Sequence, residues 1–248
     1  TGDVSPPKWY GARGVTGGGA THPAVGSFWT DAMDYVTIST TGNAQDFGNL
    51  DVAHRILAAT TNGTRGVWCG GHTMGVIFDT MQYVTIASLG DADDFGNLTT
   101  TSYNPAACSN GTRGIIHIGY TPSAKVDTIE KITISSAANA VDFGDSTEDR
   151  YGSNSASNGT IGVTALGYTG SPSVTIDKVN IASDGNATDV GDIPTGNPGR
   201  DAGITNSSPT HLHYSGGYGP GAFSPNTADV IERMSFVSKG TMVDVGNL

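Results

Sequence analysis

Carboxylates are the side chains in this sequence that come closest to forming a chemical site. The segment DADDFGN places Asp91, Asp93 and Asp94 within four residues. Oxygen-rich loops of this kind suit a hard cation such as Ca²⁺. Equivalent segments elsewhere, such as GNAQDFGN, hold one or two acids. Calcium binding is therefore the weaker interpretation, and the stronger one is structural, because an Asp in a tight turn can accept backbone N–H groups.

Catalytic chemistry has less support. The sequence contains no G-x-S-x-G segment, and Cys69 and Cys108 stand outside any C-x-x-C pair, so we expect free thiols. His211 and His213 occupy alternate positions, as two metal ligands on one face of a strand would, but no further ligand is specified nearby. Glu148 and Asp149, in the loop DSTEDRYG, are expected to be solvated. We predict no enzymatic activity, no cofactor and no metal centre.

Composition restricts the partners and the fold class. The 248 residues include 36 Gly, and 23 acids outnumber 12 Lys and Arg, for a net charge of -11. Because clustered Lys and Arg hold a phosphate backbone, we expect no nucleic-acid partner. No run approaches the roughly 18 apolar residues that span a bilayer, so no membrane insertion is expected. Lys and Glu are scarce while Gly, Thr, Ser, Asn and Asp abound, which favours short strands joined by tight turns.

A repeat of about 48 residues runs through the whole chain. Segments such as DYVTIST and QYVTIAS recur at steps of 48, 48, 47 and 55 residues, with their first apolar column at Val36, Val84, Ile132, Val179 and Met234. Ten residues later comes a DFG-like signature, whose acids are Asp46, Asp94, Asp142, Asp189 and Asp244. Five copies, at approximately 1–50, 51–98, 99–145, 146–193 and 194–248, fill a predicted single domain.

Each copy reads as four strands. Asn-Gly steps at Asn62, Asn110 and Asn158 predict two-residue hairpins that join the stretch before each step to a second strand ending in Gly. The YVTIAS-type strand and a short strand ending in DFGNL follow. Four short antiparallel strands in about 48 residues are typical of one propeller blade. The sequence therefore predicts an all-β fold, a five-bladed β-propeller.

This order of segments resembles a kelch-type blade, and YVTIAS, GNAxDFGNL and NGTRGV are similar to repeats in virion appendage proteins of marine tailed phages, cyanophages among them. Kelch repeats have a Trp in the fourth strand where this chain has Phe47, Phe95, Phe143, Val190 and Val245. The resemblance implies a non-enzymatic structural or receptor-recognition component of a virion fibre, tail or capsid appendage. Such a protein would lie at the virion surface or be extracellular, contact other virion proteins or copies of itself, and bind host-surface carbohydrate. The alternatives are a free lectin-like propeller and, less favoured, a propeller enzyme.

Residues shared by the copies are best explained by packing. We expect the DFG aromatic or Val to pack between neighbouring blades, the Gly to allow a bulge or turn, and the Asp to accept backbone N–H groups. Arg13, Arg65 and Arg113 share another column. They are expected to form hydrogen bonds to a turn carbonyl or ion pairs between blades, and we hypothesise that they pair with the DFG carboxylates.

The loops that differ between copies are the expected binding region. The first and last copies carry the longest loops, GATHPAVGSFWTDAM and GYGPGAFSPNTADV, which should become neighbours when the ring closes. They contain the candidate ligand-binding residues His22, Phe28, Trp29, Tyr218 and Phe223. Aromatic rings beside polar groups suit sugars. The alternative is that these loops cover the seam or contact other subunits.

Two ring closures are compatible with the repeat. If the Gly-ending strand is innermost, the N-terminal segment up to Tyr10 completes the blade that begins near Thr210 and clasps the ring. If the stretch before the Asn-Gly step is innermost, each copy forms its own blade. We favour the clasp, because it ties down both termini, although Pro6 and Pro7 restrict that segment to an edge strand.

Overall fold

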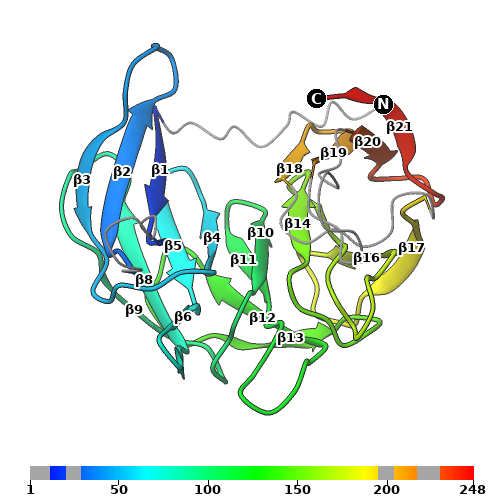
Figure 1. The fold of residues 1–248 in the computed structure, drawn as a ribbon, viewed down its shortest axis with the longest axis horizontal. Helices are drawn as coiled ribbons and strands as arrows, with labels where there is room; N and C mark the ends of the chain where they lie inside the picture. The colour runs from blue at the N-terminus through cyan, green and yellow to red at the C-terminus, as the bar shows by residue number, and fades with distance from the viewer. Residues whose placement is uncertain (1–11, 21–28, 195–203, 217–229) are drawn as a thin grey trace.

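The computed structural model describes residues 12–20, 29–194, 204–216 and 230–248. These residues form an all-β, five-bladed β-propeller, as the repeat predicted (Figure 1). Each blade is an antiparallel sheet whose strands follow one another in chain order. Across these ranges, no helix is long and apolar enough to cross a membrane.

The blades share one strand pattern. Blade one contains β1 (Arg13–Gly17), β2 (Ala32–Thr37) and β3 (Gln45–Asn49). Blade two contains β4 (Ala58–Thr61), β5 (Arg65–Cys69), β8 (Thr80–Thr85) and β9 (Asp93–Asn97), with β6 (His72–Thr73) and β7 (Val76–Ile77) as a small hairpin in a loop. Blade three contains β10 (Ala106–Ser109), β11 (Arg113–His117), β12 (Thr128–Thr133) and β13 (Val141–Asp145). Blade four contains β14 (Asn154–Ser157), β15 (Ile161–Ala165), β16 (Thr175–Asn180) and β17 (Thr188–Asp192). Blade five contains β18 (Ile204–Ser207), β19 (His211–Ser215), β20 (Val230–Ser235) and β21 (Val243–Asn247).

In blades two to four the innermost strand is the stretch before the Asn-Gly step, and β18 holds the same place in blade five. Figure 1 shows β4, β10, β14 and β18 nearest the centre, with the DFG strands on the outside. The inner strands are joined by hydroxyl groups: the Ser109 hydroxyl donates to the Thr61 carbonyl at 2.7 Å, and Ser207 donates to Ser157 at 2.7 Å. The clasp required the Gly-ending strand to be innermost, so that prediction is wrong. The segment up to Tyr10 lies outside the described residues.

Tight turns join the inner strands to the second strands, as the Asn-Gly steps predicted. The hairpins β4–β5, β10–β11 and β14–β15 all turn at these steps. In the first of them Gly63 has a φ of 83°, and the Asn62 side-chain oxygen accepts the backbone N–H groups of Thr64 and Arg65 at 3.0 and 2.7 Å. Asn favours such turns because its side chain substitutes for a backbone acceptor.

In blades one to four, the DFG segment, or its DVG equivalent, holds neighbouring blades together. Phe143 packs against Val179 and Ile181 of the next blade, and Phe47, Phe95 and Val190 pack in the same way. The predicted packing between blades is therefore confirmed for these copies. In blade five, Val245 is 45% exposed, and Val36 in blade one is 42% exposed. The apolar faces of the first and last blades are thus uncovered by the described residues.

The Gly of this pattern is required by close approach of the next blade. A Cβ atom on Gly191, whose φ is 149°, would lie 2.0 Å from the carbonyl oxygen of Gly240. The Asp plays the role predicted for it: Asp94 accepts the N–H of Gly96 at 3.0 Å, and Asp189 accepts that of Gly191 at 2.9 Å. The sequence predicted a turn or bulge at the Gly, and the structure adds the neighbouring backbone as the reason why a side chain is excluded.

The shared arginines bind backbone carbonyl groups of the next blade. Arg13 donates to the carbonyl of Ile86 at 3.0 Å, and Arg65 donates to that of Ile134 at 3.3 Å. Arg113 donates to Ile181 at 3.4 Å and also forms an ion pair with Asp184 at 2.9 Å. The expected hydrogen bonds to carbonyl groups are confirmed. The hypothesis that the arginines pair with the DFG carboxylates is wrong, because the guanidinium groups donate instead to carbonyl groups that directly follow the third strand of the next blade.

Candidate functional site

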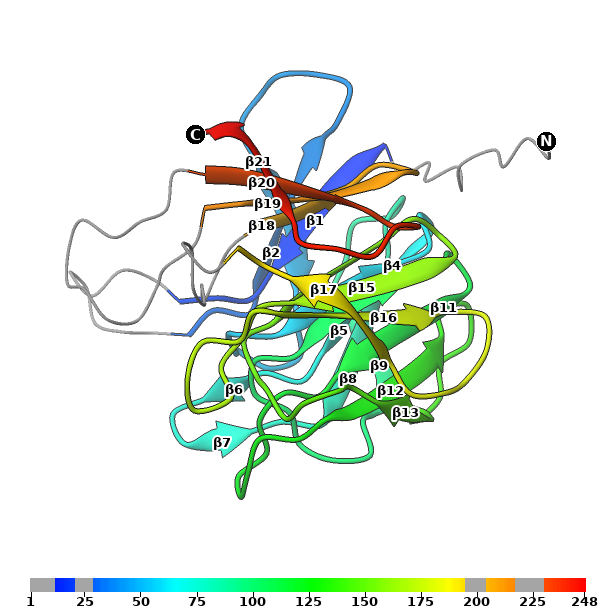
Figure 2. The same cartoon turned by 90° about the vertical axis from the view of Figure 1, so that its right-hand side faces the viewer.

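A continuous row of aromatic rings lies at one end of the ring, where the second strands finish and the loops to the third strands begin. We call this end the loop end. Figure 2 shows the β6–β7 hairpin projecting from it. The aromatic row, drawn from blades one to four, consists of Trp29, His72, Tyr103, Tyr120, Tyr151 and Tyr168.

Neighbouring rings of the row contact one another edge to face or tilted. The ring centroids of His72 and Tyr103 are 5.0 Å apart, and those of Tyr120 and Tyr151 are 5.6 Å apart. Trp29 begins the row, 5.8 Å from His72. All six side chains are half-buried. Such geometry fixes the rings while leaving part of each ring at the surface.

Short backbone bridges place these rings. The residue after the Gly-ending strand pairs with the residue three positions before the inner strand. These bridges join Arg55 to His72, Tyr103 to Tyr120, and Tyr151 to Tyr168. Because the bridge repeats from blade to blade, it brings one or two rings per blade to the loop end.

A cation lies at the first end of the row. The guanidinium carbon of Arg55 is 4.1 Å from the centre of the Trp29 ring, a cation–π contact. His72 contacts the same indole ring, and His54, 1% exposed, precedes Arg55 and packs on Phe78. We call Trp29, His54, Arg55 and His72 the Trp29 cluster.

The histidines of the Trp29 cluster favour the neutral form. Burial lowers the pKa of His54. The pKa of His72 is lowered first by burial and then by the Arg55 charge. A neutral imidazole offers one N–H donor and one acceptor nitrogen.

The predicted ligand-binding residues are only partly within the described chain. Trp29 belongs to the aromatic row, whereas His22, Phe28, Tyr218 and Phe223 lie outside the described residues, as does the predicted meeting of the two long loops. The other rings of the row were not singled out from the sequence. Their signal was present: an aromatic ring or histidine follows the Gly-ending strand at His72, Tyr120, Tyr168 and Tyr218.

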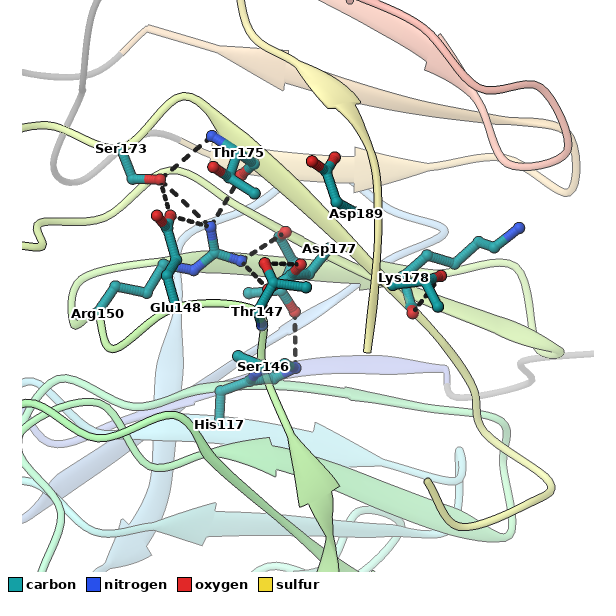
Figure 3. A network of polar contacts seen from close by, with 12 residues as sticks. His117, Ser146, Thr147, Glu148, Arg150, Ser173, Thr175, Asp177, Lys178 and Asp189 are labelled. Atoms are coloured by element: carbon teal, nitrogen blue, oxygen red, sulfur yellow. Dashed lines mark hydrogen bonds and ion pairs between the residues drawn. The ribbon is translucent and has the colours of Figure 1, made fainter. Parts of the chain in front are cut away.

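A second cluster of polar groups lies inside blade four (Figure 3). Arg150 donates to Asp177 at 2.8 Å and to Glu148 at 3.1 Å, and the Arg150 and Asp177 side chains are only 2% and 1% exposed. Thr147 donates its hydroxyl to Asp177 at 2.5 Å. Asp149 is exposed, as expected, whereas Glu148 is only partly exposed and pairs with Arg150, so the expectation is wrong for Glu148. Apart from Arg150 Nε, which has no partner in the described structure, the charged groups of this cluster are paired with one another, so we assign the cluster a structural role.

His117 is part of the same interior. Its Nδ1 lies 3.0 Å from the Ser146 hydroxyl, and its Nε2 lies 2.7 Å from that of Thr164. Burial, together with the Arg150 charge, lowers the pKa of His117 to about 3. The imidazole is therefore neutral over the ordinary pH range and acts as a hydrogen-bonding link between blades three and four.

Asp177 belongs to a column of residues that was not singled out from the sequence. In the third strand of every blade, the pairing register shifts by one residue, and each member of the column directly follows that shift. The members are Asp34, Gln82, Glu130, Asp177 and Glu232. Gln82 accepts the backbone N–H of Asp51 at 2.5 Å, and Glu130 accepts that of Thr99. Each of these two side chains thereby caps the segment that enters its own blade from the preceding one.

Two of the three weak calcium candidates accept a backbone N–H group. Asp91 accepts the N–H of Asn49 at 2.9 Å, and Asp94 accepts that of Gly96, while Asp93 is exposed. Within the ranges that the structure describes, no group of three His, Cys, Asp or Glu side chains could hold a metal ion. Cys69 and Cys108 are free and buried, as predicted, and burial raises the pKa of each thiol to about 12.

Replacing Glu130 with Gln tests the capping role. Burial raises the pKa of Glu130 above its usual value. Because this pKa is higher in the folded chain, the side chain's contribution to stability is greatest below the unfolded pKa and is lost as pH rises through the folded pKa. Glu130→Gln should keep the cap and gain stability relative to wild type as pH rises through this window. Urea unfolding at pH 4 and pH 8 measures the difference.

Gln82→Glu is the matched control, because Gln82 caps the same position without charge. It should introduce the pH dependence that Glu130→Gln removes. If Glu130→Gln changed the free energy of unfolding by the same amount at pH 4 and pH 8, the pH dependence of stability could not be assigned to Glu130.

Comparison with known proteins adds no family: no protein-family model matches the chain, and no curated protein is significantly similar to it.

Proposed function

We propose that this protein is a non-enzymatic recognition propeller that binds carbohydrate along the aromatic row. The supporting observation is the row itself: six half-buried rings in mutual contact at the loop end. The apolar C–H face of a sugar packs on such rings, and its hydroxyl groups suit the polar atoms around them. A row of several rings favours an extended saccharide over a single sugar unit.

The biological setting that we propose is attachment. The resemblance of the repeats to those of phage virion appendages supports a position on a virion surface, where the loop end would contact host-surface carbohydrate. The net charge of -11 is unfavourable for binding a polyphosphate backbone. Neighbouring virion proteins or copies of the same chain would carry the propeller.

A free lectin-like propeller is the second candidate. The repeated bridges Tyr103–Tyr120 and Tyr151–Tyr168 offer two equivalent pairs of rings, as expected for repeated weak binding sites. Repeated sites would bind several short saccharides per chain, whereas a single row would bind one extended saccharide. The stoichiometry measured by calorimetry distinguishes these two modes of binding.

Removing the two ends of the row tests the proposal. Trp29→Ala with Tyr168→Ala should weaken glycan binding by about tenfold, because two aromatic contacts contribute about 1–3 kcal/mol together. Trp29 and Tyr168 contact fewer rings than Tyr103 or Tyr151, so the fold should persist. A glycan array followed by calorimetry on the bound saccharide measures the effect.

Tyr35→Ala is the matched control. Tyr35 is a half-buried ring beside Arg13 in blade one, and it makes no contact with the aromatic row in the described chain. This control should bind as the wild type does. Equal binding by the wild type and the Trp29, Tyr168 double variant would exclude the aromatic row as the site.

A further inference from the structure

Unpaired polar atoms are concentrated in the Trp29 cluster. Trp29 Nε1, Arg55 Nε, His72 Nδ1 and both ring nitrogens of His54 are buried, and none has a hydrogen-bond partner in the described structure. Buried polar groups of native proteins are almost always paired, and leaving one unpaired is costly. A ligand or bound solvent at this cluster would satisfy these atoms.

The chemistry of these atoms indicates an acceptor-rich ligand. The indole and guanidinium groups can only donate, and each neutral imidazole has one N–H to donate. All five unpaired atoms are nitrogens. Since the Arg55 charge repels cations from the neighbouring imidazole groups, a metal ion is disfavoured here. A ligand with several acceptor oxygens fits this set.

Arg55 differs from four other arginines of the described chain. Arg13 and Arg65 donate to carbonyl groups of the next blade, and Arg113 and Arg150 have carboxylate partners. The guanidinium of Arg55 has neither kind of partner in the described part of the chain, although the protein as a whole is strongly acidic. Its plane is held against the Trp29 ring at 4.1 Å. A guanidinium held in this way is prepared for bidentate contact with an oxyanion.

We propose that the Trp29 cluster binds the oxyanion of an acidic sugar, with Arg55 as the cation that selects it. This inference rests on the proposed carbohydrate function and adds a substrate class, sugars that carry a carboxylate or a sulfate. The remaining rings of the row hold the adjoining sugar units. Carboxylate is planar and sulfate is tetrahedral, but each presents a pair of oxygens that a guanidinium fork can bind.

Matched saccharides test the charge requirement. Calorimetry compares tri-galacturonate with its methyl ester, and a sulfated galactose oligosaccharide with its unsulfated form. The wild type should bind at least one charged member about tenfold more tightly than its neutral partner, a difference of about 1.4 kcal/mol. The member that shows the preference identifies the oxyanion as carboxylate or sulfate. Higher ionic strength should reduce the preference.

Arg55→Gln should abolish the preference, so that the charged and the neutral saccharide bind this variant with equal affinity. Arg65→Gln is the matched control. Arg65, like Arg55, stacks on an aromatic ring, that of Tyr83 at 4.0 Å, but it lies at the opposite end of blade two. The control should keep the preference. If Arg55→Gln fails to fold, the ratio of charged to neutral binding by the wild type decides the proposal.

The outcomes separate this inference from the proposed function. Equal binding of charged and neutral saccharides would overturn the acidic-sugar assignment and leave carbohydrate binding intact. A preference that survives in Arg55→Gln would overturn the role of Arg55. Absence of binding to any saccharide of an array that includes neutral, carboxylated and sulfated glycans would overturn both the inference and the proposed function.

Discussion

Gly191→Ala is expected to lower the free energy of unfolding by about 4 kcal/mol, because a strained backbone conformation and an overpacked contact each cost about 1–3 kcal/mol. The added Cβ would lie 2.0 Å from the carbonyl oxygen of Gly240, which is backbone and cannot turn away. The φ of 149° is a further strain for any side chain. Urea denaturation followed by circular dichroism measures the loss.

Gly246→Ala is the matched control. Gly246 holds the same place in the DVG segment of blade five and has the same φ of 149°, but a Cβ there would have no atom within 4 Å. Its substitution should cost only the conformational strain, about 1–3 kcal/mol. Equal losses for Gly191→Ala and Gly246→Ala would show that the approach of the neighbouring blade does not explain the glycine.

Arg150→Met is expected to cost about 3–5 kcal/mol, because removing one partner of a buried ion pair leaves the other charge uncompensated. Asp177, with a side chain 1% exposed, and Glu148 would both lose their cation. For a chain of this size the melting temperature should fall by about 6–20 °C, since each kcal/mol corresponds to about 2–4 °C. Thermal unfolding followed by calorimetry measures the shift.

Arg113→Met is the comparison for the buried pair. Arg113 pairs with Asp184, whose side chain is 50% exposed, and exposed pairs contribute about 0–1 kcal/mol. This variant should therefore melt close to the wild type. Adding Asp177→Asn to Arg150→Met should recover part of the loss, because the uncompensated carboxylate is removed. No recovery in the double variant would assign the loss to packing and contradict the electrostatic explanation.

The sequence determined the number of blades and much of their packing. Columns such as Val84 and Phe95 recur at a fixed interval, and a blade can bury them only against its neighbours. The turn at Asn62 was predictable because its geometry depends on two adjacent residues. Features set by local chemistry or by strict repetition were therefore predictable without coordinates.

The period did not predict which strand of each blade is innermost, because a repeat of four strands reads the same from any starting strand. The deciding signal is side-chain size. The inner strands read AATT, AACS, NSAS and ITNS, and small residues are what the crowded axis of the ring accommodates. Gly-rich second strands were mistaken for the inner ones, although residues such as Trp68 within them are too large for that position.

The candidate site was only partly predictable because its rings come from segments far apart in the chain. Trp29 was identified from its loop, but the contact of His72 with Tyr103 depends on how adjacent blades are placed. The same is true of Arg13 and its carbonyl partner in blade two. A column of residues shows what is repeated, and only the arrangement of blades shows what each residue contacts.

The most direct test of the central claim is a hydrogen-exchange footprint of the wild-type protein with and without the saccharide that it binds. Binding at the aromatic row should slow amide exchange at the loop end, in residues 54–55, 72–78, 103–104, 120–126 and 168–173. Exchange at the Asn-Gly turns, residues 62–64, 110–112 and 158–160, should not change. Protection at those turns with none at the loop end would contradict the assignment of the aromatic row as the recognition surface.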